Sequence, residues 1–301
     1  MGRTRTRTPD LAALLPSWLI HLQAEHKSPQ TIRLYRVGAR QFIDWCAERD
    51  RPAVLDRPTV TAFVASVMEH GEPATGRARL MALRQFSKWL AAEGEIREDL
   101  IATVKPPKQD TKIVNSLGDD ELRRLLKACQ GPTLRDRRDE AIIRLMVETG
   151  CRSHELLALT TEDVDLLRGT VTIRRGKGGK GRTVPVGPQT VRALDRYLRL
   201  RRQHRRGDSA WLWLGHGDGA LAHAGLAFMF KRRAEEAGIG HVHPHMLRHT
   251  FASRWLGAGG TESGLMSVAG WSRRDMIDRY SASNRERLAA EEARRLKLGD
   301  L

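Results

Sequence analysis

The sequence has few cysteines, and it lacks the marks of an exported or membrane-spanning protein. Its three cysteines, Cys46, Cys129 and Cys151, include no C-x-x-C pair, so the spacing predicts neither a disulfide framework nor a cysteine-based zinc module. No apolar run approaches the roughly 18 residues that a membrane helix needs. The N-terminal MGRTRTRTPD is basic and has no apolar core of a signal peptide. We therefore expect reduced thiols in a cytoplasmic protein.

Acidic residues are scarce relative to basic ones. The 301 residues include 52 lysines and arginines against 36 aspartates and glutamates, which gives a formal net charge of +16. A charge of this size says more about partners than about fold, and it indicates a polyanion. On charge alone, DNA, RNA and an anionic membrane surface all stay open, as does a basic protein with no such partner. The length suits two domains better than one.

Helical periodicity dominates the first hundred residues. Ser28 is placed as an N-cap and Pro29 as the first helical position, and apolar residues follow at helical spacing to Cys46. The same spacing predicts helices over residues 11–24, 58–68 and 74–93. We expect a flexible basic arm over residues 1–9 and a helical DNA-binding domain over residues 10–102. Basic residues along one side of the second and of the fourth helix are DNA-binding candidates, although a solvated face would explain any single one: Arg33, Arg36, Arg40, Arg77, Arg84 and Lys88.

A change of composition marks a domain boundary at residues 103–115. The stretch TVKPPKQDTKIVNS has two prolines, several charges and little apolar periodicity, which is typical of an extended linker. From residue 116 to residue 301 the chain reads as a second, mostly helical domain, with Ser116 as the cap of its first helix. Further helices are predicted over residues 136–148, 188–205, 224–237, 244–256 and 284–297.

The period changes from helical to alternating after residue 169. TVTIRR and RTVPV read as two strands joined by the glycine-rich turn GKGGKG, which carries Lys177 and Lys180. The string GKGGKGRT also comes near a nucleotide-binding P-loop, but Arg182 stands where that motif has lysine, and a P-loop must open a helix. Because Pro185 and the alternation favour a strand, we interpret the segment as a β-hairpin.

Four separate segments carry residues suited to phosphodiester chemistry: TGCRSHELLAL with Arg152 and Glu155, the hairpin turn with Lys177, HVHPHMLRHT with His245 and Arg248, and GWSRRDMIDRY with Trp271 and Tyr280. Their order and spacing resemble those of the tyrosine recombinase or phage integrase family, in particular its compact Xer-like and Cre-like members. The resemblance covers the second domain, and the first is similar to the family's SAM-like core-binding domain. It implies a mainly α fold with a small antiparallel β-sheet, closed as a two-domain C-shaped clamp around double-stranded DNA.

The resemblance also implies a catalytic set of two arginines, a hairpin lysine, a histidine, a tryptophan and a nucleophilic tyrosine, supported by one acidic residue: Arg152, Arg248, Lys177, His245, Trp271, Tyr280 and Glu155. Most members have histidine in the position of Trp271, and a minority, the Cre-type enzymes among them, have tryptophan. A 3′-phosphotyrosine intermediate keeps the energy of the broken bond, so the resemblance implies no ATP, no metal ion and no other cofactor. It further implies a tetramer on two DNA sites, with residues 284–297 docking onto a neighbouring subunit.

The chemistry of strand cleavage calls for these residue types. A phosphodiester under attack gathers negative charge on its non-bridging oxygens, and the guanidiniums of Arg152 and Arg248 can clamp those oxygens while remaining protonated. The phenol of Tyr280 has an ordinary pKa of about 10, so it needs nearby cations and a proton acceptor, for which His245 is a candidate. A lysine on a glycine-rich turn can protonate the leaving 5′-oxygen. Trp271 can only donate one hydrogen bond and pack, so it has no acid–base role.

Other interpretations fit parts of the sequence. The four histidines between His241 and His249 could suggest zinc, but no cysteine or carboxylate set completes a site. A type IB topoisomerase-like enzyme uses a comparable residue set to relax DNA, and a DNA-binding regulator could keep the clamp without the catalysis. The complete catalytic set argues against the regulator. We expect site-specific recombination in DNA integration, excision or resolution, carried out at the nucleoid.

Overall fold

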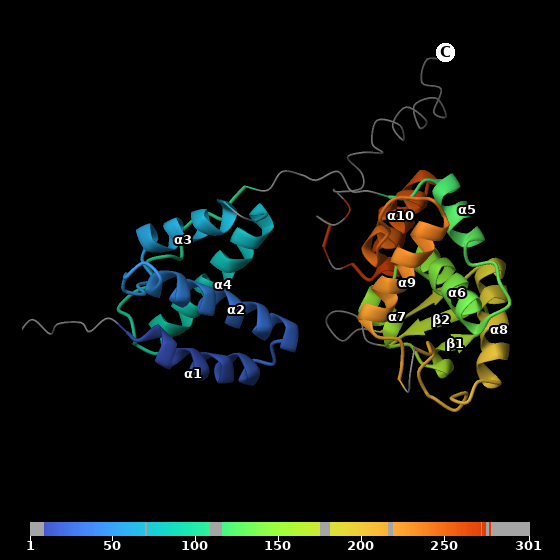
Figure 1. The fold of residues 1–301 in the computed structure, drawn as a ribbon, viewed down its shortest axis with the longest axis horizontal. Helices are drawn as coiled ribbons and strands as arrows, with labels where there is room; N and C mark the ends of the chain where they lie inside the picture. The colour runs from blue at the N-terminus through green and yellow to red at the C-terminus, as the bar shows by residue number, and fades with distance from the viewer. Residues whose placement is uncertain are drawn as a thin grey trace, which may run out of the picture. The chain divides into compact units, whose positions relative to one another are not determined.

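The computed structural model describes residues 9–69, 71–108, 116–174, 181–215, 219–271, 273–274 and 277. The chain divides into two compact units, Met1–Lys112 and Ile113–Leu301 (Figure 1). Within the described ranges, no helix combines the length and the apolar character that crossing a membrane requires.

The described part of the first unit is helical, as the periodicity predicts. Its helices are α1 (Leu11–Ala24), α2 (Pro29–Ala47), α3 (Arg57–Glu69) and α4 (Pro73–Ala92). Ser28 caps α2, since its hydroxyl accepts a hydrogen bond from the Thr31 backbone N–H at 3.1 Å. The four helices meet around buried aromatic rings, among which Trp18 of α1 stacks on Phe86 of α4 with ring centroids 4.6 Å apart.

The first unit extends past α4 into the stretch expected as a linker. Ile101 and Val104 are buried in the same core as the aromatic rings of α1 to α4. The expected linker therefore begins within the packed unit. Residues 109–115 lie outside the described residues, as do residues 1–8 of the expected basic arm.

The second unit is mainly helical with a small sheet, which confirms the expected fold class. Its described elements are α5 (Asp119–Lys127), α6 (Leu134–Thr149), α7 (Ser153–Leu157), η1 (Thr161–Asp163), β1 (Val164–Asp165), β2 (Thr170–Ile173), β3 (Arg182–Pro185), α8 (Pro188–Arg202), α9 (His223–Glu236), α10 (Pro244–Gly257) and α11 (Glu262–Ala269). Helix α6 packs against both α8 and α10, so it forms the centre of the unit. Figure 1 shows the sheet in yellow-green beside α6 and α8.

The predicted hairpin is present as two antiparallel strands. β2 lies between β1 and β3, and Val171 pairs with Val164 on one side and with Val184 on the other. Val171, Ile173 and Val184 are buried, so alternate residues of the strands face the core. The segment predicted as the glycine-rich turn, with Lys177 and Lys180, lies outside the described residues.

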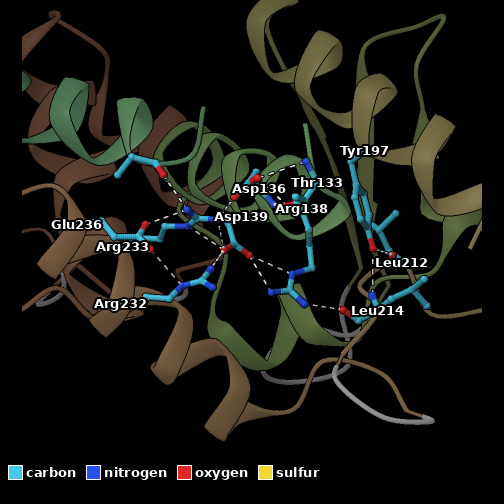
Figure 2. Close-up of polar contacts among 11 residues, drawn as sticks. Thr133, Asp136, Arg138, Asp139, Tyr197, Leu212, Leu214, Arg232, Arg233 and Glu236 are labelled. Atoms are coloured by element: carbon cyan, nitrogen blue, oxygen red, sulfur yellow. Dashed lines mark hydrogen bonds and ion pairs between the residues drawn. The ribbon is translucent and has the colours of Figure 1, made fainter. Parts of the chain in front are cut away.

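A cluster of ion pairs ties the start of α6 to α9 (Figure 2). Asp139 is completely buried and accepts hydrogen bonds from Arg138 at 2.8 Å, Arg232 at 2.7 Å and Arg233 at 3.0 Å. Arg233 also pairs with Asp136 and Glu236, at 2.7 and 2.8 Å. The buried guanidiniums are thus matched by carboxylates, which is the condition under which buried charge is tolerated.

Several local expectations need correction or lie beyond the described chain. The first helix of the second unit is capped by Gly118 instead of Ser116, because the carboxylate of Glu121 reaches back to the Gly118 N–H at 2.9 Å and fixes the start there. Helix α8 ends at Arg202, three residues earlier than predicted. The short helices α7 and α11 were missed, since each is too short for a periodic signal. The predicted helix over residues 284–297 lies outside the described residues.

Candidate active site

The first site arginine is positioned by a tight turn after α6. Gly150 ends α6 in the left-handed conformation, with φ 58°, and a Cβ there would collide with the ring of Phe251. Arg152 is the N-cap of α7, and its backbone N–H donates to Glu155 Oε2 at 2.8 Å. Its guanidinium donates to Glu155 Oε1 at 2.9 Å and to the Gly270 carbonyl at 3.2 Å. Arg152 is therefore held at both its backbone and its side chain.

Glu155 is a buried anion shared by two arginines. Arg182 of β3 donates to both of its oxygens, at 3.2 and 2.9 Å, while Arg152 binds the Oε1 atom. Burial works to raise the pKa of this carboxyl, but hydrogen bonds from Arg182 and from the Arg152 backbone, with the charges of both guanidiniums, outweigh it and hold the pKa at about 2. Glu155 is therefore ionised throughout the physiological range.

The second site arginine is almost fully buried. Arg248 of α10 is 2% exposed and donates to the carbonyls of Gly150 and Ala269, the latter at 2.9 Å. Its guanidinium carbon lies 5.2 Å from the ring centroid of Trp271, which is within the range of a cation–π contact. Trp271 is buried as well, so it packs against the arginine as its residue type predicts.

A hollow of about 250 Å³ brings three of the predicted catalytic residues together. Arg152, His245 and Arg248 all line it, although Arg152 is far from the other two in the sequence. His154 and His223 line it too, and neither was selected from the sequence. Burial lowers the pKa of His154; the charge of Glu155 opposes this shift, and Arg152, His223 and Arg248 add to it. The hollow is thus walled by imidazoles and fixed guanidiniums, a lining suited to a phosphate group.

The histidine-rich segment does not form a metal site among the described residues. His243 instead caps α10, because its Nδ1 accepts a hydrogen bond from the Met246 N–H at 3.2 Å. Burial, followed by the neighbouring His241, lowers the pKa of His243, which favours the neutral ring that this cap requires. The His245 and His249 rings meet edge to face with centroids 4.3 Å apart.

Arg182 is a third residue of the site that the sequence reasoning missed, after His154 and His223. It drew notice only because it replaces a P-loop lysine, yet its side chain is 13% exposed and bound to Glu155. The strand alternation carried a usable signal. Arg182 is two residues before Val184 and four before Val186, so it shares their core-facing side, and a charge on that side requires an acidic partner.

Two of the predicted catalytic residues, Lys177 and Tyr280, lie outside the described residues. The six predicted DNA-binding residues of the first unit are on α2 and α4. Arg33, Arg36, Arg77 and Lys88 are exposed, and Arg33 and Arg36 line a hollow at the junction of α1 and α2. The other two have local partners: Arg40 pairs with Asp44 at 3.0 Å, and Arg84 donates to the Ala102 carbonyl.

Guanidiniums fixed around one hollow, in a helical unit with a small antiparallel sheet, are suited to an enzyme that acts on phosphodiesters. Comparison with known proteins gives the family. Residues 115–287 match the phage integrase family, and residues 15–94 match the phage integrase N-terminal SAM-like domain. The chain therefore belongs to the phage integrase family, the site-specific tyrosine recombinases that cleave and rejoin DNA strands.

Curated relatives and solved structures agree with this assignment. The chain is 35% identical over 269 residues to a tyrosine recombinase XerC of Xanthomonas campestris, covering 87% of this chain and 81% of the relative. It is 33% identical to XerC of Azotobacter vinelandii, covering 82% and 83%. Among solved structures, it resembles the XerH recombinase bound to difH DNA after cleavage, with a TM-score of 0.74 and 21% identity over 93% of this chain and 84% of that one. It also resembles the Tn1549 transposon integrase bound to transposon end DNA, with a TM-score of 0.75 and 19% identity over 95% and 99%.

Proposed function

We propose that this recombinase cuts one DNA strand by attack of Tyr280 on a phosphodiester seated in the hollow between Arg152, His245 and Arg248. The observation that carries the proposal is the convergence of those three side chains, from the N-cap of α7 and from α10, on one hollow. The bond from phosphorus to the 5′-oxygen breaks as the bond from phosphorus to the phenolic oxygen forms, which leaves a 3′-phosphotyrosine. The 5′-hydroxyl of the partner strand later reverses this step and releases Tyr280.

The side chains around the phosphate have separate tasks in this proposal. Arg152 and Arg248 bind the non-bridging oxygens, whose charge grows in the transition state. His245 accepts or shares the proton of the Tyr280 hydroxyl. Lys177 gives a proton to the leaving 5′-oxygen, and Trp271 packs on Arg248 and orients it. None of these tasks calls on a metal ion, ATP or another cofactor.

The decisive experiment for the nucleophile starts by mapping the target site. The full-length protein is incubated with DNA of its source genome, and fragments that stay attached under denaturing conditions are sequenced. A nicked suicide duplex carrying the mapped site then traps the covalent complex on a denaturing gel. Tyr280→Phe is expected to abolish the adduct while DNA binding stays nearly intact, since it removes one hydroxyl from a large charged interface.

The matched control for this change is Tyr35→Phe, which alters a tyrosine whose ring stacks on Trp18 in the first unit. It should form the adduct at the normal rate. An adduct formed by the Tyr280→Phe protein would show that another residue is the nucleophile.

The role of Lys177 has its own test, because Lys180 belongs to the same glycine-rich segment of the sequence. Lys177→Ala should slow cleavage by about 10²–10⁴, the usual contribution of a general acid, and Lys180→Ala should cost far less. A substrate with sulfur in place of the bridging 5′-oxygen has a leaving group that needs no proton. It should restore cleavage to the Lys177 variant, and absence of rescue would assign the acid to another residue.

We further propose that the active unit is a tetramer on two DNA sites, acting at the nucleoid in integration, excision or resolution. The XerC relatives favour recombination over simple relaxation of DNA by a type IB topoisomerase. Sedimentation of the protein with a duplex carrying the mapped site tests the assembly. Relaxation of supercoiled DNA by a monomer, without preference for a site, would contradict it.

A further inference from the structure

The C-terminal end of α11 gathers arginines from three different elements. Its last carbonyls, those of Val268, Ala269 and Gly270, each accept a hydrogen bond from a separate guanidinium, at 2.8, 2.9 and 3.2 Å in that order: Arg182 of β3, Arg248 of α10 and Arg152 of the α7 N-cap. Two of these arginines, Arg152 and Arg248, are the ones proposed to bind the phosphate oxygens. The third, Arg182, has no role in the proposed mechanism.

The geometry of a helix end explains why cations collect there. The final carbonyls of a helix have no intrahelical N–H partner and carry the negative end of the helix dipole. Gly270 closes α11 in the left-handed conformation, with φ 64°. The exposed carbonyls thus form a short row, and each guanidinium bound to the row has a fixed position relative to the next.

Arg182 connects this row of carbonyls to the buried carboxylate. Its Nε donates to Val268, while Nη1 and Nη2 donate to the two oxygens of Glu155, at 3.2 and 2.9 Å. Glu155 in turn binds the guanidinium of Arg152. The side chain of Arg182 is 13% exposed, so its planar fork is enclosed between the strand and the helix end.

We propose that Arg182 is a positioning residue for strand cleavage, which fixes Glu155 against the end of α11 and so holds Arg152 at the reacting phosphate. This inference rests on the proposed function. Arg182 acts through Glu155 and is separated from the phosphate by it, so its loss should affect the rate of cleavage more than the binding of DNA.

The first test is Arg182→Ala, measured by single-turnover adduct formation on the nicked suicide duplex. Because a small misplacement of a catalytic group can cost about 10²-fold in rate, we expect cleavage to slow by about that factor. DNA affinity in a mobility-shift assay should stay close to that of the unchanged protein, since the change leaves the first unit and the two arginines proposed to bind the phosphate in place.

The pH profile of cleavage separates positioning from loss of folding. Removing Arg182 takes away the strongest of the influences that lower the pKa of Glu155, while burial still raises it. The pKa of Glu155 therefore rises, and cleavage by the alanine variant should fall toward acidic pH over a range in which the unchanged protein stays active. Among the described residues, the other charged or titratable groups that interact with Glu155 include Arg152, Cys151 and His154, and Arg248 lies near the last two; all four are present in both proteins.

Arg182→Lys is the conservative variant. Lysine retains a positive charge beside Glu155 but has no fork to reach both the carboxylate and the Val268 carbonyl. It should remove the acid-side decline and recover part of the rate. Gly270→Ala disturbs the same contact from the other side, since a Cβ there would lie 2.8 Å from Arg182 Nη1 at a left-handed residue, and it should slow cleavage with Arg182 still in place.

Arg201→Ala is the matched control, because Arg201 is also a buried arginine that binds backbone carbonyls, those of Leu212, Gly207, Ser209 and Trp211. It should lower the melting temperature but keep the cleavage rate per folded molecule and its pH profile. Equal cleavage by the Arg182→Ala and unchanged proteins would overturn the inference, as would a parallel loss of DNA binding without the acid-side decline. Absence of any adduct with the unchanged protein would instead contradict the proposed function itself.

Discussion

The second unit contains two clusters of arginines that are held in different ways. Around Asp139, the guanidiniums of Arg138, Arg232 and Arg233 face an equal number of carboxylates, which are supplied by Asp136, Asp139 and Glu236 (Figure 2). In the candidate active site, Arg152, Arg182 and Arg248 are held among the described residues by the carboxylate of Glu155 and by the backbone carbonyls of Gly150, Val268, Ala269 and Gly270.

The difference in partners suits a difference in task. Carboxylates neutralise arginines, so the Asp139 cluster joins two helices without leaving charge for a ligand. A carbonyl fixes a guanidinium but carries only a partial charge, so the positive charge of the arginine stays available to a phosphate. The partners of an arginine therefore suit it either to joining two helices or to binding a phosphate.

The largest effect is expected from breaking the Asp139 cluster. Asp139→Asn removes the buried charge that three guanidiniums share, and breaking a buried pair costs about 3–5 kcal/mol of the free energy of unfolding. Urea unfolding of the full chain measures it. Asp44→Asn is the control, since Asp44 pairs with Arg40 on an exposed helix face, and such pairs contribute about 0–1 kcal/mol. Equal destabilisation by both changes would show that the buried Asp139 cluster stabilises the fold no more than an exposed ion pair does.

Arg248→Lys should have its main effect on catalysis. Lysine cannot reproduce the fork that binds Gly150 and Ala269, and loss of one preorganised transition-state donor slows a reaction by about 10²–10³. Adduct formation on the suicide duplex gives the rate. Arg254→Lys, on the same helix but in an exposed pair with Asp119, should leave the rate unchanged. If the Arg248 variant lost as much stability as the Asp139 variant but cleaved DNA at the normal rate, Arg248 would be a structural residue and not a catalytic one.

Acid should weaken the fold through Glu155. The pKa of this carboxyl is lowered from an ordinary value of 4.5 to about 2, so its contribution to stability is complete above pH 4.5 and is lost as the pH falls toward 2. The shift corresponds to about 3 kcal/mol. Thermal melting between pH 5 and pH 2 should therefore show a steeper decline for the unchanged protein than for Glu155→Gln, and identical slopes would argue against the shared carboxylate.

The smallest change is expected in the salt dependence of DNA binding, from two arginines of the first unit. If Arg33 and Arg36 contact phosphates, their joint change to alanine lowers the slope of log affinity against log salt by about 0.9 for each phosphate that is no longer neutralised. Fluorescence anisotropy over a salt series measures the slope. Arg49→Ala changes one charge just beyond the end of α2, at a residue that packs over Trp45, and it should leave the slope unaltered. A slope equal to that of the unchanged protein would exclude α2 from the DNA interface.

Much of the fold follows from local sequence patterns. The helices with clear periodicity, such as α2 with its Ser28 cap, lie where the spacing predicts them, and the switch to alternation predicts β2 and β3. The short helices α7 and α11 could not be predicted, because a helix of one or two turns is stabilised by tertiary contacts more than by its own sequence. These two helices turn out to place Arg152 and the carbonyls that hold it.

The sequence by itself determined which residues are available for the chemistry and which family the chain belongs to, since residue types and their spacing can be read from the linear chain. Only the tertiary structure decided how those residues are held. The convergence of Arg152, His245 and Arg248 on one hollow, and the sharing of Glu155 by Arg182, join segments separated by many residues. No local pattern encodes such contacts, because they depend on where a strand and the end of a helix meet after the core has packed.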